Sequence, residues 1–184
     1  MTIWGDNMLD RQQRPILATE RLRLRAPDAG DVEALVRLVN DPDIARMTTG
    51  IPYPYTLDHG CAFIAMVEAA DPAHDLPLLI EHQRYGPMGM VGLHRRARAW
   101  PEIGYWLGRE FWGLGFATEA AKALVEFATQ SRGHRVLASG HFADNPASGR
   151  VLEKLGFLYT GEVIARASYG RDEAALTRMM VRLA

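Results

Sequence analysis

Apolar and polar positions follow two different periods in the first part of the chain, and each change of period marks a predicted element. Residues Glu20–Ala26 alternate two leucines with three arginines, which predicts a half-buried strand. The apolar positions of Val32–Val39 repeat at helical spacing and stop before an Asn-Asp-Pro run, which predicts a short amphipathic helix. The segment Ile44–Tyr55 is broken by one glycine and two prolines, which indicates a loop.

A second helix and a hairpin are predicted next. Thr56 is a candidate cap for the helix because its hydroxyl can accept a hydrogen bond from a free N–H of the first turn. The apolar face expected on that helix consists of Ala62, Phe63, Met66 and Val67. The apolar runs Leu76–Gln83 and Met88–His94 are separated by Arg-Tyr-Gly-Pro, which favours an antiparallel hairpin.

A strand, a helix and another strand follow in the middle of the chain. Residues Glu102–Leu107 predict a strand, and Gly113–Ser131 change to a period of 3.6 with one apolar stripe. The run Val136–Phe142 predicts the second strand. A crossover of this kind makes its two strands parallel, and the strands either have another strand between them or splay apart.

The last elements complete the predicted fold. They are a helix over Pro146–Leu155 and strands near Phe157–Ile164 and Ala174–Leu183. Together the elements predict an α/β fold of α+β character with a mixed sheet. Residues 1–18 have no periodicity and predict an irregular N-terminal arm, and residues 19–184 predict a single domain.

Composition and charge exclude several classes of protein. The 184 residues contain a single cysteine, Cys61, so we expect no internal disulfide, no structural metal and a reducing compartment such as the cytoplasm. The 21 basic and 22 acidic residues give a formal net charge of −1, which argues against a nucleic-acid partner. The sequence contains no apolar run long enough for a signal peptide or a membrane span.

The segment Glu102–Ala123 is the first candidate for chemistry, because a predicted strand runs through a glycine-rich turn into a helix. Gly113 and Gly115 permit a tight turn in which several N–H groups converge on an anion at the helix N-terminus. A tight turn without any ligand-binding role explains the two glycines equally well. A dinucleotide fingerprint requires a third glycine where Thr118 stands, and a P-loop requires Gly-Lys-Ser/Thr, so both of these nucleotide motifs are excluded.

The second candidate is Asn145–Phe157, which reads as a helix with both ends specified. Asn145 is the expected cap, Pro146 the first helical residue and Gly156 the left-handed terminator. Asn145 and Ser148 are expected beside the carboxyl end of the preceding strand. Their side chains can serve either the cap or a ligand.

Three segments, in this order and spacing, resemble the GNAT superfamily of acetyl-coenzyme A-dependent N-acetyltransferases, and within it the RimJ/RimL-like branch. The segments are Thr19–Leu35, Glu102–Ala120 and Asp144–Phe157. The family's cofactor loop, Gln/Arg-x-x-Gly-x-Gly/Ala, is matched at both glycines. Its leading position is Glu110 here, with Arg109 one residue early.

The resemblance implies a central, mostly antiparallel sheet of about six or seven strands, splayed at the cofactor site and flanked by about four helices. It implies direct attack on acetyl-coenzyme A by a primary amine, with a peptide or protein N-terminal α-amino group as the expected acceptor. Two alternatives remain open. One is a small amine, such as an amino acid, a polyamine or an aminoglycoside, and the other is a non-catalytic module that binds acyl-coenzyme A. We expect a monomer or a homodimer.

The resemblance also implies which residues form the site. For the cofactor they are Tyr105, Trp106, Leu107, Trp112, Gly113, Leu114, Gly115, Phe116, Ala117, Asn145 and Ser148. The main chain near Tyr105–Leu107 is expected to bind the pantetheine arm as a strand edge binds a peptide, and an N–H near Trp106 or Leu107 to stabilise the oxyanion.

The predicted chemistry needs a base and a proton donor. Glu102 is the candidate base, unless it is only a solvated residue at the start of a strand, and Ser148 is the candidate acid for the departing thiolate, unless it only binds. Many related enzymes use a tyrosine further along the helix of Ser148, and this sequence has none there. His94 and His141 are alternative bases. Tyr53 and Tyr55 are the expected acceptor-binding residues, because related enzymes place such a loop over the amine.

Overall fold

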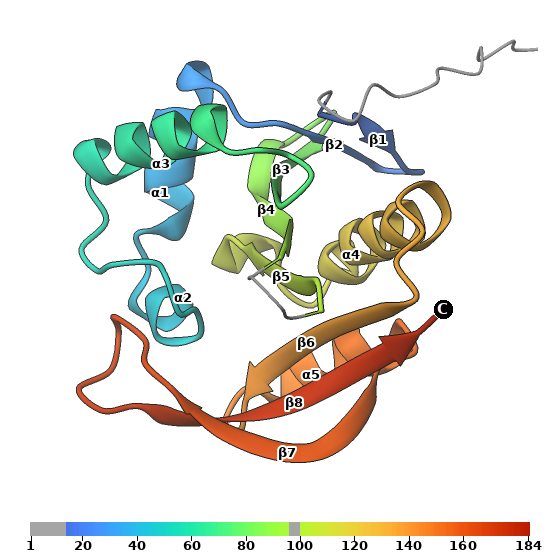
Figure 1. Cartoon of the computed structure of the whole chain (residues 1–184). Helices are drawn as coiled ribbons and strands as arrows, with labels where there is room; N and C mark the ends of the chain where they lie inside the picture. Colours follow the sequence, from blue (N-terminus) through green and yellow to red (C-terminus); the bar gives the residue numbers. More distant parts are fainter. Residues whose placement is uncertain (1–13, 96–99) are drawn as a thin grey trace, which may run out of the picture.

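The computed structural model describes residues 14–95 and 100–184 of the chain. Within them, eight strands form one sheet in the order β1-β2-β3-β4-β5-β6-β8-β7 (Figure 1). Neighbouring strands are antiparallel except for β5 and β6, which are parallel. The strands are β1 (Leu17–Ala18), β2 (Leu22–Arg25), β3 (Asp75–His82), β4 (Gly86–His94), β5 (Glu102–Leu107), β6 (Val136–Phe142), β7 (Leu158–Arg166) and β8 (Ala175–Leu183).

Helices cover both faces of this sheet. The α-helices of the described residues are α1 (Val32–Val39), α2 (Pro42–Arg46), α3 (Leu57–Ala69), α4 (Phe116–Glu126) and α5 (Pro146–Lys154). Helices α1 and α3 pack against each other and against β3 and β4, whereas α4 packs on the other side of β4 and β5, and α5 packs on β6 (Figure 1). The molecule is therefore a sheet between two layers of helices.

The buried side chains divide between the two faces of the sheet. On β3, Leu79 packs with Val32 and Ile64 of α1 and α3, whereas Leu78 and Ile80 belong to the larger core under α4. Successive strand residues point to opposite faces, so a strand covered on both sides needs a continuous apolar run. This explains why the β3 sequence does not alternate.

Several predicted elements are confirmed. Helix α1 and strands β5 and β6 have the bounds that the sequence pattern indicates. The predicted cap of α3 is present, since the hydroxyl of Thr56 accepts a hydrogen bond from the N–H of His59. Asn145 likewise caps α5, because its side-chain oxygen accepts from the N–H of Ser148 at 3.2 Å.

Two segments that were expected to be irregular contain regular structure. The predicted arm lies outside the described residues as far as residue 13, but Leu17 and Ala18 pair with β2 as β1, which brings the strand count above the expected six or seven. Helix α2 extends into the expected loop as far as Arg46. Asp41 starts it by accepting a hydrogen bond from the N–H of Asp43, and proline is its first residue.

The buried face of α3 differs from the prediction. Gly60, Ile64 and Val67 are buried, whereas Met66 is 52% exposed. The reason is a close approach of two helices: a Cβ on Gly60 would lie 2.9 Å from a methyl group of Val32 on α1. A prediction from apolar periodicity counts large apolar side chains, so it does not include a glycine that is buried where two helices pack closely.

Helix α4 begins three residues later than predicted. Gly113 and Gly115 have φ angles of 75° and 83°, in the left-handed region, so they form the turn before the helix. The helix ends at Glu126 and continues as a five-residue π turn over Phe127–Ser131.

The parallel strands β5 and β6 are paired at one position only, Glu102 with Ala138. Near it, the N–H of Ala138 donates to the carbonyl of Pro101 at 2.8 Å, and the hydroxyl of Ser139 donates to the carbonyl of Ile103 at 2.8 Å. Beyond these contacts the two strands diverge (Figure 1). The crossover prediction is confirmed, and the sheet is open between β5 and β6.

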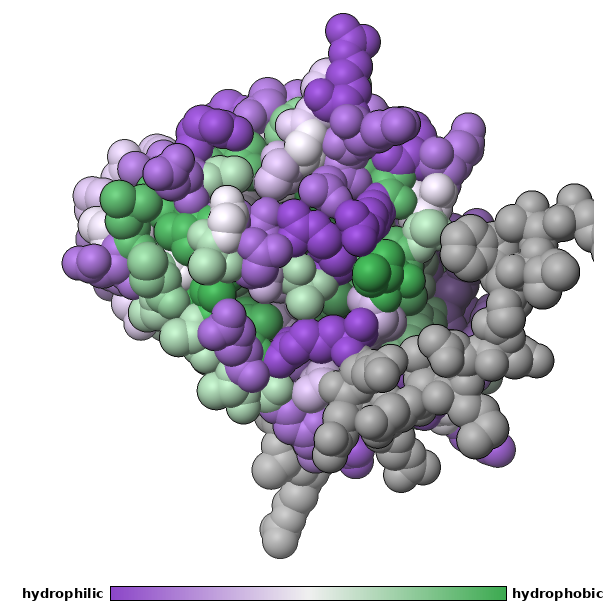
Figure 2. Space-filling model, turned by 90° about the horizontal axis from the view of Figure 1, so that it is seen from above, coloured by the Kyte–Doolittle hydropathy of each residue, from purple (hydrophilic) through white to green (hydrophobic). Residues whose placement is uncertain are grey.

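On the face shown in Figure 2, hydrophilic residues lie between groups of hydrophobic residues.

In the described part of the chain, none of the helices has both the length and the apolar character needed to cross a lipid bilayer.

Candidate active site

Two cavities open where β5 and β6 diverge. The first, of about 410 Å³, is lined by residues 47–51 and Tyr55 together with β4, β5 and β6, and we call it the loop cavity. The second, of about 580 Å³, is lined by the glycine turn and by α5, and we call it the turn cavity. Both cavities are lined by Met47, Thr48, Tyr105, Trp106 and Ser148. The two cavities therefore meet at these five residues.

Most of the predicted cofactor residues line the turn cavity. They are Tyr105, Trp106, Leu107, Trp112, Gly113, Gly115, Phe116, Ala117, Asn145 and Ser148. Leu114 does not, since its side chain is 55% exposed and its carbonyl accepts a hydrogen bond from Arg21 at 3.3 Å.

The glycine turn has the geometry of an anion cradle. A Cβ on Gly113 would have no neighbour within 4 Å, and one on Gly115 would meet only a guanidinium nitrogen of Arg21 at 3.5 Å. Backbone conformation, and not lack of space, therefore requires glycine at both positions. The turn leads directly into the N-terminus of α4, whose free N–H groups and dipole favour a bound anion.

The turn cavity also contains cationic side chains that the sequence prediction missed. Arg150 and Lys154 line it from α5, four residues apart and thus on one helix face. The sequence signal that could have identified these two residues is their helical spacing after Asn145, the cap of α5. Arg109, by contrast, pairs with Asp41 at 2.7 Å and also with Asp43, so its guanidinium is tied to α2.

The edge of β5 that faces the gap offers free backbone groups. The N–H of Gly108 donates to the carbonyl of Met88 on β4. Because backbone groups alternate along a strand, the N–H and C=O of Trp106 also point toward β4, whereas those of Tyr105 and Leu107 point toward the gap. The carbonyl of Leu107 accepts from the indole of Trp112 at 2.7 Å. Of the two residues expected to supply an oxyanion donor, only Leu107 therefore directs its N–H into the gap.

The side chain of Tyr105 meets Ser148 at the junction of the cavities. The phenol donates to the carbonyl of Ser148 at 2.9 Å, and its oxygen lies 3.0 Å from the hydroxyl oxygen of Ser148. Burial raises the pKa of Tyr105 to about 12, although the hydrogen bond with Ser148 acts in the opposite direction. At neutral pH the phenol is therefore protonated and acts as a hydrogen-bond donor. Strand β5 thus supplies a hydroxyl next to Ser148 of α5.

Glu102 lines the loop cavity and is held by an arginine that the sequence prediction did not include. Arg166, at the end of β7, donates to both carboxylate oxygens of Glu102, at 2.6 and 3.2 Å. The two residues are 64 positions apart, and no local pattern links them. The candidate base is therefore one half of a bidentate ion pair.

The remaining candidates differ in their positions. Tyr55 lines the loop cavity, and burial raises its pKa, whereas Tyr53 is 47% exposed and is not part of either cavity lining. His94 lines the loop cavity and pairs with Asp75. His141 is buried outside the cavities, between its neighbour's carbonyl and the phenol of Tyr159. It contacts structural groups and not the site.

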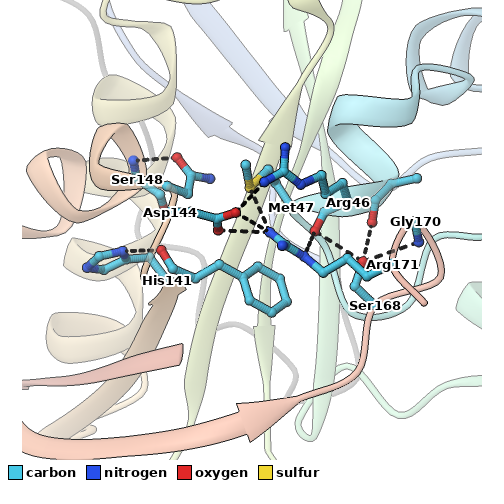
Figure 3. A network of polar contacts seen from close by, with 11 residues as sticks. Arg46, Met47, His141, Asp144, Ser148, Ser168, Gly170 and Arg171 are labelled. Atoms are coloured by element: carbon cyan, nitrogen blue, oxygen red, sulfur yellow. Dashed lines mark hydrogen bonds and ion pairs between the residues drawn. The ribbon is translucent and has the colours of Figure 1, made fainter. Parts of the chain in front are cut away.

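A network around Asp144 holds α2 next to the site (Figure 3). Asp144 follows β6 and pairs with Arg46 of α2 and with Arg171 at 2.8 Å. Burial alone would raise the pKa of Asp144, but the bonds from both guanidinium groups keep it below its usual value. The hydroxyl of Ser168 donates to the carbonyl of Ala45 at 2.7 Å. The network thereby supports Met47, which follows Arg46 and lines both cavities.

A splayed sheet with a glycine cradle beside the gap defines the class of acyl-coenzyme A-dependent transferases. In agreement, residues 21–158 match the acetyltransferase (GNAT) domain, and the chain belongs to this family. It is an acetyltransferase whose cofactor is acetyl-coenzyme A. The resemblance to the GNAT superfamily is thus confirmed.

Relatives and solved structures support the same assignment. The Bacillus subtilis protein named uncharacterized N-acetyltransferase YoaA is 30% identical over 155 residues, which are 80% of this chain and 85% of the relative. RimL, a ribosomal L7/L12 α-N-protein acetyltransferase solved with coenzyme A, has a TM-score of 0.79 at 21% identity, covering 92% of this chain and 98% of RimL. The spermidine N-acetyltransferase from Vibrio cholerae has a TM-score of 0.75 at 18% identity, covering 90% and 96% of the two chains. These two structures share the fold.

Proposed function

We propose that the chain transfers acetyl from acetyl-coenzyme A to a peptide or protein N-terminal α-amino group by direct attack in a ternary complex. The observation that carries this proposal is the meeting of the two cavities at Tyr105, Trp106 and Ser148. An amine that enters through the loop cavity reaches a thioester that extends from the turn cavity without a covalent enzyme intermediate. RimL, which shares the fold, is named for acetylation of a protein α-amino group.

The residues of the turn cavity fit acetyl-coenzyme A. The left-handed glycines and the start of α4 suit the diphosphate, and the charges of Arg150 and Lys154 complement it. The free edge of β5 suits the amides of an extended pantetheine arm. When bound, acetyl-coenzyme A supplies an activated thioester whose thiol is a good leaving group.

In this proposal two groups of the chain stabilise the negative charges that develop during the attack, and a third group positions one of them. The N–H of Leu107 donates to the carbonyl oxygen as negative charge grows on it. The hydroxyl of Ser148 donates to the departing sulfur, and the phenol of Tyr105 holds Ser148 in place. A serine hydroxyl and a phenol of pKa about 12 are both weaker acids than a thiol of pKa ~8.5, so the role of this pair is hydrogen-bond donation to the sulfur and not full proton transfer.

Glu102 is the proposed acceptor of the amine proton, directly or through water. An α-amino group has a pKa of ~7.7–8.0, so a large fraction is already neutral in weakly alkaline solution and a modest base suffices. Arg166 fixes both oxygens of the carboxylate at the wall of the loop cavity. The ion pair therefore fixes the orientation of the proposed base.

The decisive experiment measures release of coenzyme A thiol with a thiol reagent. The protein is incubated with acetyl-coenzyme A and a panel of amidated peptides with different N-terminal residues, next to the same peptides with acetylated N-termini. Thiol release that requires the free α-amino group supports the proposal, and mass spectrometry should locate one acetyl group on that nitrogen.

Two results would overturn the proposal. Calorimetric binding of acetyl-coenzyme A without thiol release from any amine would identify a coenzyme-binding module instead. Transfer to small amines with no transfer to any peptide would assign the enzyme to small-molecule acceptors.

A further inference from the structure

The loop cavity carries little net charge, which constrains the acceptor. Among the described residues that line it, Glu102 is the only carboxylate and Arg166 the only guanidinium. Much of the remaining lining is apolar, including Leu35, Val39, Ile51, Phe63, Met90 and Trp106. The cavity therefore resembles an apolar pocket with one ion pair in its wall.

The ion pair cancels the one negative charge of the cavity lining. Arg166 reaches both oxygens of Glu102, and the two side chains are 22% and 27% exposed, so the contact is largely shielded from water. Bidentate pairs of this kind are strong because both donors align with both acceptors. A second cation entering the cavity would have to compete with Arg166 for the same oxygens.

The carboxylates next to the cavity are paired as well. Asp75 pairs with His94, and Asp144 is held by Arg46 and Arg171. On the side of the turn cavity, Asp41 and Asp43 both pair with Arg109. Each of these four carboxylates therefore already has a partner, and an incoming polycation would have to compete for it.

We propose that the acceptor presents a single amine on an apolar body, and that Arg166 is the residue that excludes polyamines by occupying Glu102. This inference rests on the proposed function and specifies its acceptor class. A diamine delivers one neutral amine to the thioester, but its other ammonium enters an apolar cavity. Desolvation of that ammonium is costly unless a carboxylate pairs with it.

The test compares spermidine with the amidated peptide Leu-Gly-Gly in the wild type, Arg166→Met and the charge-conserving Arg166→Lys. We expect the wild-type kcat/KM for the peptide to exceed that for spermidine by about tenfold or more. Arg166→Met exposes the carboxylate, so the ratio should move toward spermidine by about tenfold. Arg166→Lys keeps the positive charge but loses the bidentate geometry, so it should move the ratio by less than Arg166→Met does.

A binding measurement makes the test independent of turnover. Spermidine is titrated calorimetrically into the protein saturated with coenzyme A, before and after Arg166→Met and in the double variant Arg166→Met with Glu102→Gln. Binding should appear in the single variant and disappear in the double variant, which has no charge to offer. Melting curves by circular dichroism confirm that the variants are folded.

The outcomes separate this inference from the proposed function. Wild-type acetylation of spermidine as fast as the peptide, or an Arg166→Met variant that binds spermidine no better than wild type, would overturn the inference while acetyl transfer stands. Absence of thiol release with every amine would overturn the proposed function, and the spermidine titration would still report on the charge of the cavity.

Discussion

At the scale of single residues, the contact of Tyr105 with Ser148 matters most for the proposed chemistry. The phenol donates to the carbonyl of Ser148 and lies 3.0 Å from its hydroxyl, at the point where the two cavities meet. The hydroxyl of Ser148 can then direct its own proton toward the sulfur of the coenzyme. Tyr105 is a positioning residue in this scheme, and Ser148 is the group that touches the reacting atoms.

We therefore expect Tyr105→Phe to lower kcat by about tenfold with little change in coenzyme affinity, because the ring still packs and only the hydrogen bond is lost. Steady-state kinetics and calorimetry measure the two quantities. In a double-mutant cycle with Ser148→Ala, the two losses should be far from additive. Additive losses, or an unchanged kcat in Tyr105→Phe, would show that the contact is only structural.

A second prediction at this scale concerns Glu102. Glu102→Gln should lower kcat/KM at neutral pH by about 10²-fold, and its pH profile should follow the ionisation of the amine alone, because the base has been removed. Glu102→Asp, which keeps the carboxylate, should retain part of the activity. An unchanged pH–rate profile in Glu102→Gln would remove Glu102 from the mechanism.

At the scale of elements, the site depends on how turns and helices are attached to the sheet. The glycine turn orients the start of α4, and a short 3₁₀ turn before α1 is fixed to β2 by an ion pair. In that pair Arg25 donates to both oxygens of Asp31, at 2.7 and 2.8 Å. Asp31 is 5% exposed, so the contact is shielded from solvent.

The glycine turn leads to a matched comparison. Gly115→Ala should weaken coenzyme binding by about tenfold, because a left-handed conformation costs an alanine about 1–2 kcal/mol and the cradle shifts to relieve it. Gly133→Ala is the control, since Gly133 also has a positive φ, of 69°, and open space around it, but lies outside both cavities. Calorimetry should show weaker binding only for the first variant. Equal affinities in both variants would contradict the assignment of the cradle.

The pair of Arg25 and Asp31 leads to a prediction about pH. Burial alone would raise the pKa of Asp31, but hydrogen bonds from Arg25 and from the backbone of Asp28 lower it overall. A carboxyl with a lower pKa in the folded state stabilises the fold above its unfolded pKa of about 4, and this contribution is lost as the pH falls through the folded pKa. Urea unfolding should therefore show Asp31→Asn to be destabilised by about 2 kcal/mol at pH 7 and by clearly less at pH 3. An equal difference at both pH values would refute this.

At the scale of the whole molecule, the sheet is made of two parts that share one backbone pairing. Strands β1–β5 form one part and β6–β8 the other, and Glu102 with Ala138 is the position where they pair. Side chains add the ion pair of Glu102 with Arg166 and the network around Asp144. The coenzyme in our proposal lies in the gap and contacts both parts.

Coenzyme A should consequently stabilise the whole fold. At a free concentration of about 100 times its Kd, binding to the folded state alone raises the free energy of unfolding by about 2.7 kcal/mol, which thermal unfolding detects as a higher Tm. Adenosine 3′,5′-diphosphate, which has no pantetheine arm, should raise it less at equal concentration. A Tm that does not change at saturating coenzyme A would contradict a site between the two parts.

Local sequence patterns were sufficient for much of this protein. Periodicity located β5 and β6, the caps at Thr56 and Asn145 marked two helices, and Gly113 and Gly115 located the turn before α4. Each of these features depends on residues within a few positions of one another. Local hydrogen bonds and the alternation of side chains are therefore enough to predict them.

Tertiary structure alone decided the rest, because it joins residues that no local pattern connects. Arg166 contacts Glu102 across 64 positions, and Tyr105 contacts Ser148 across 43. Both contacts depend on the arrangement of β5 and β6, which pair at Glu102 and Ala138 and then diverge. Packing also chose the buried face of α3, where Gly60 admits α1. The sequence determined most of the elements and the position of the glycine turn, and packing determined which charges meet in the cavity.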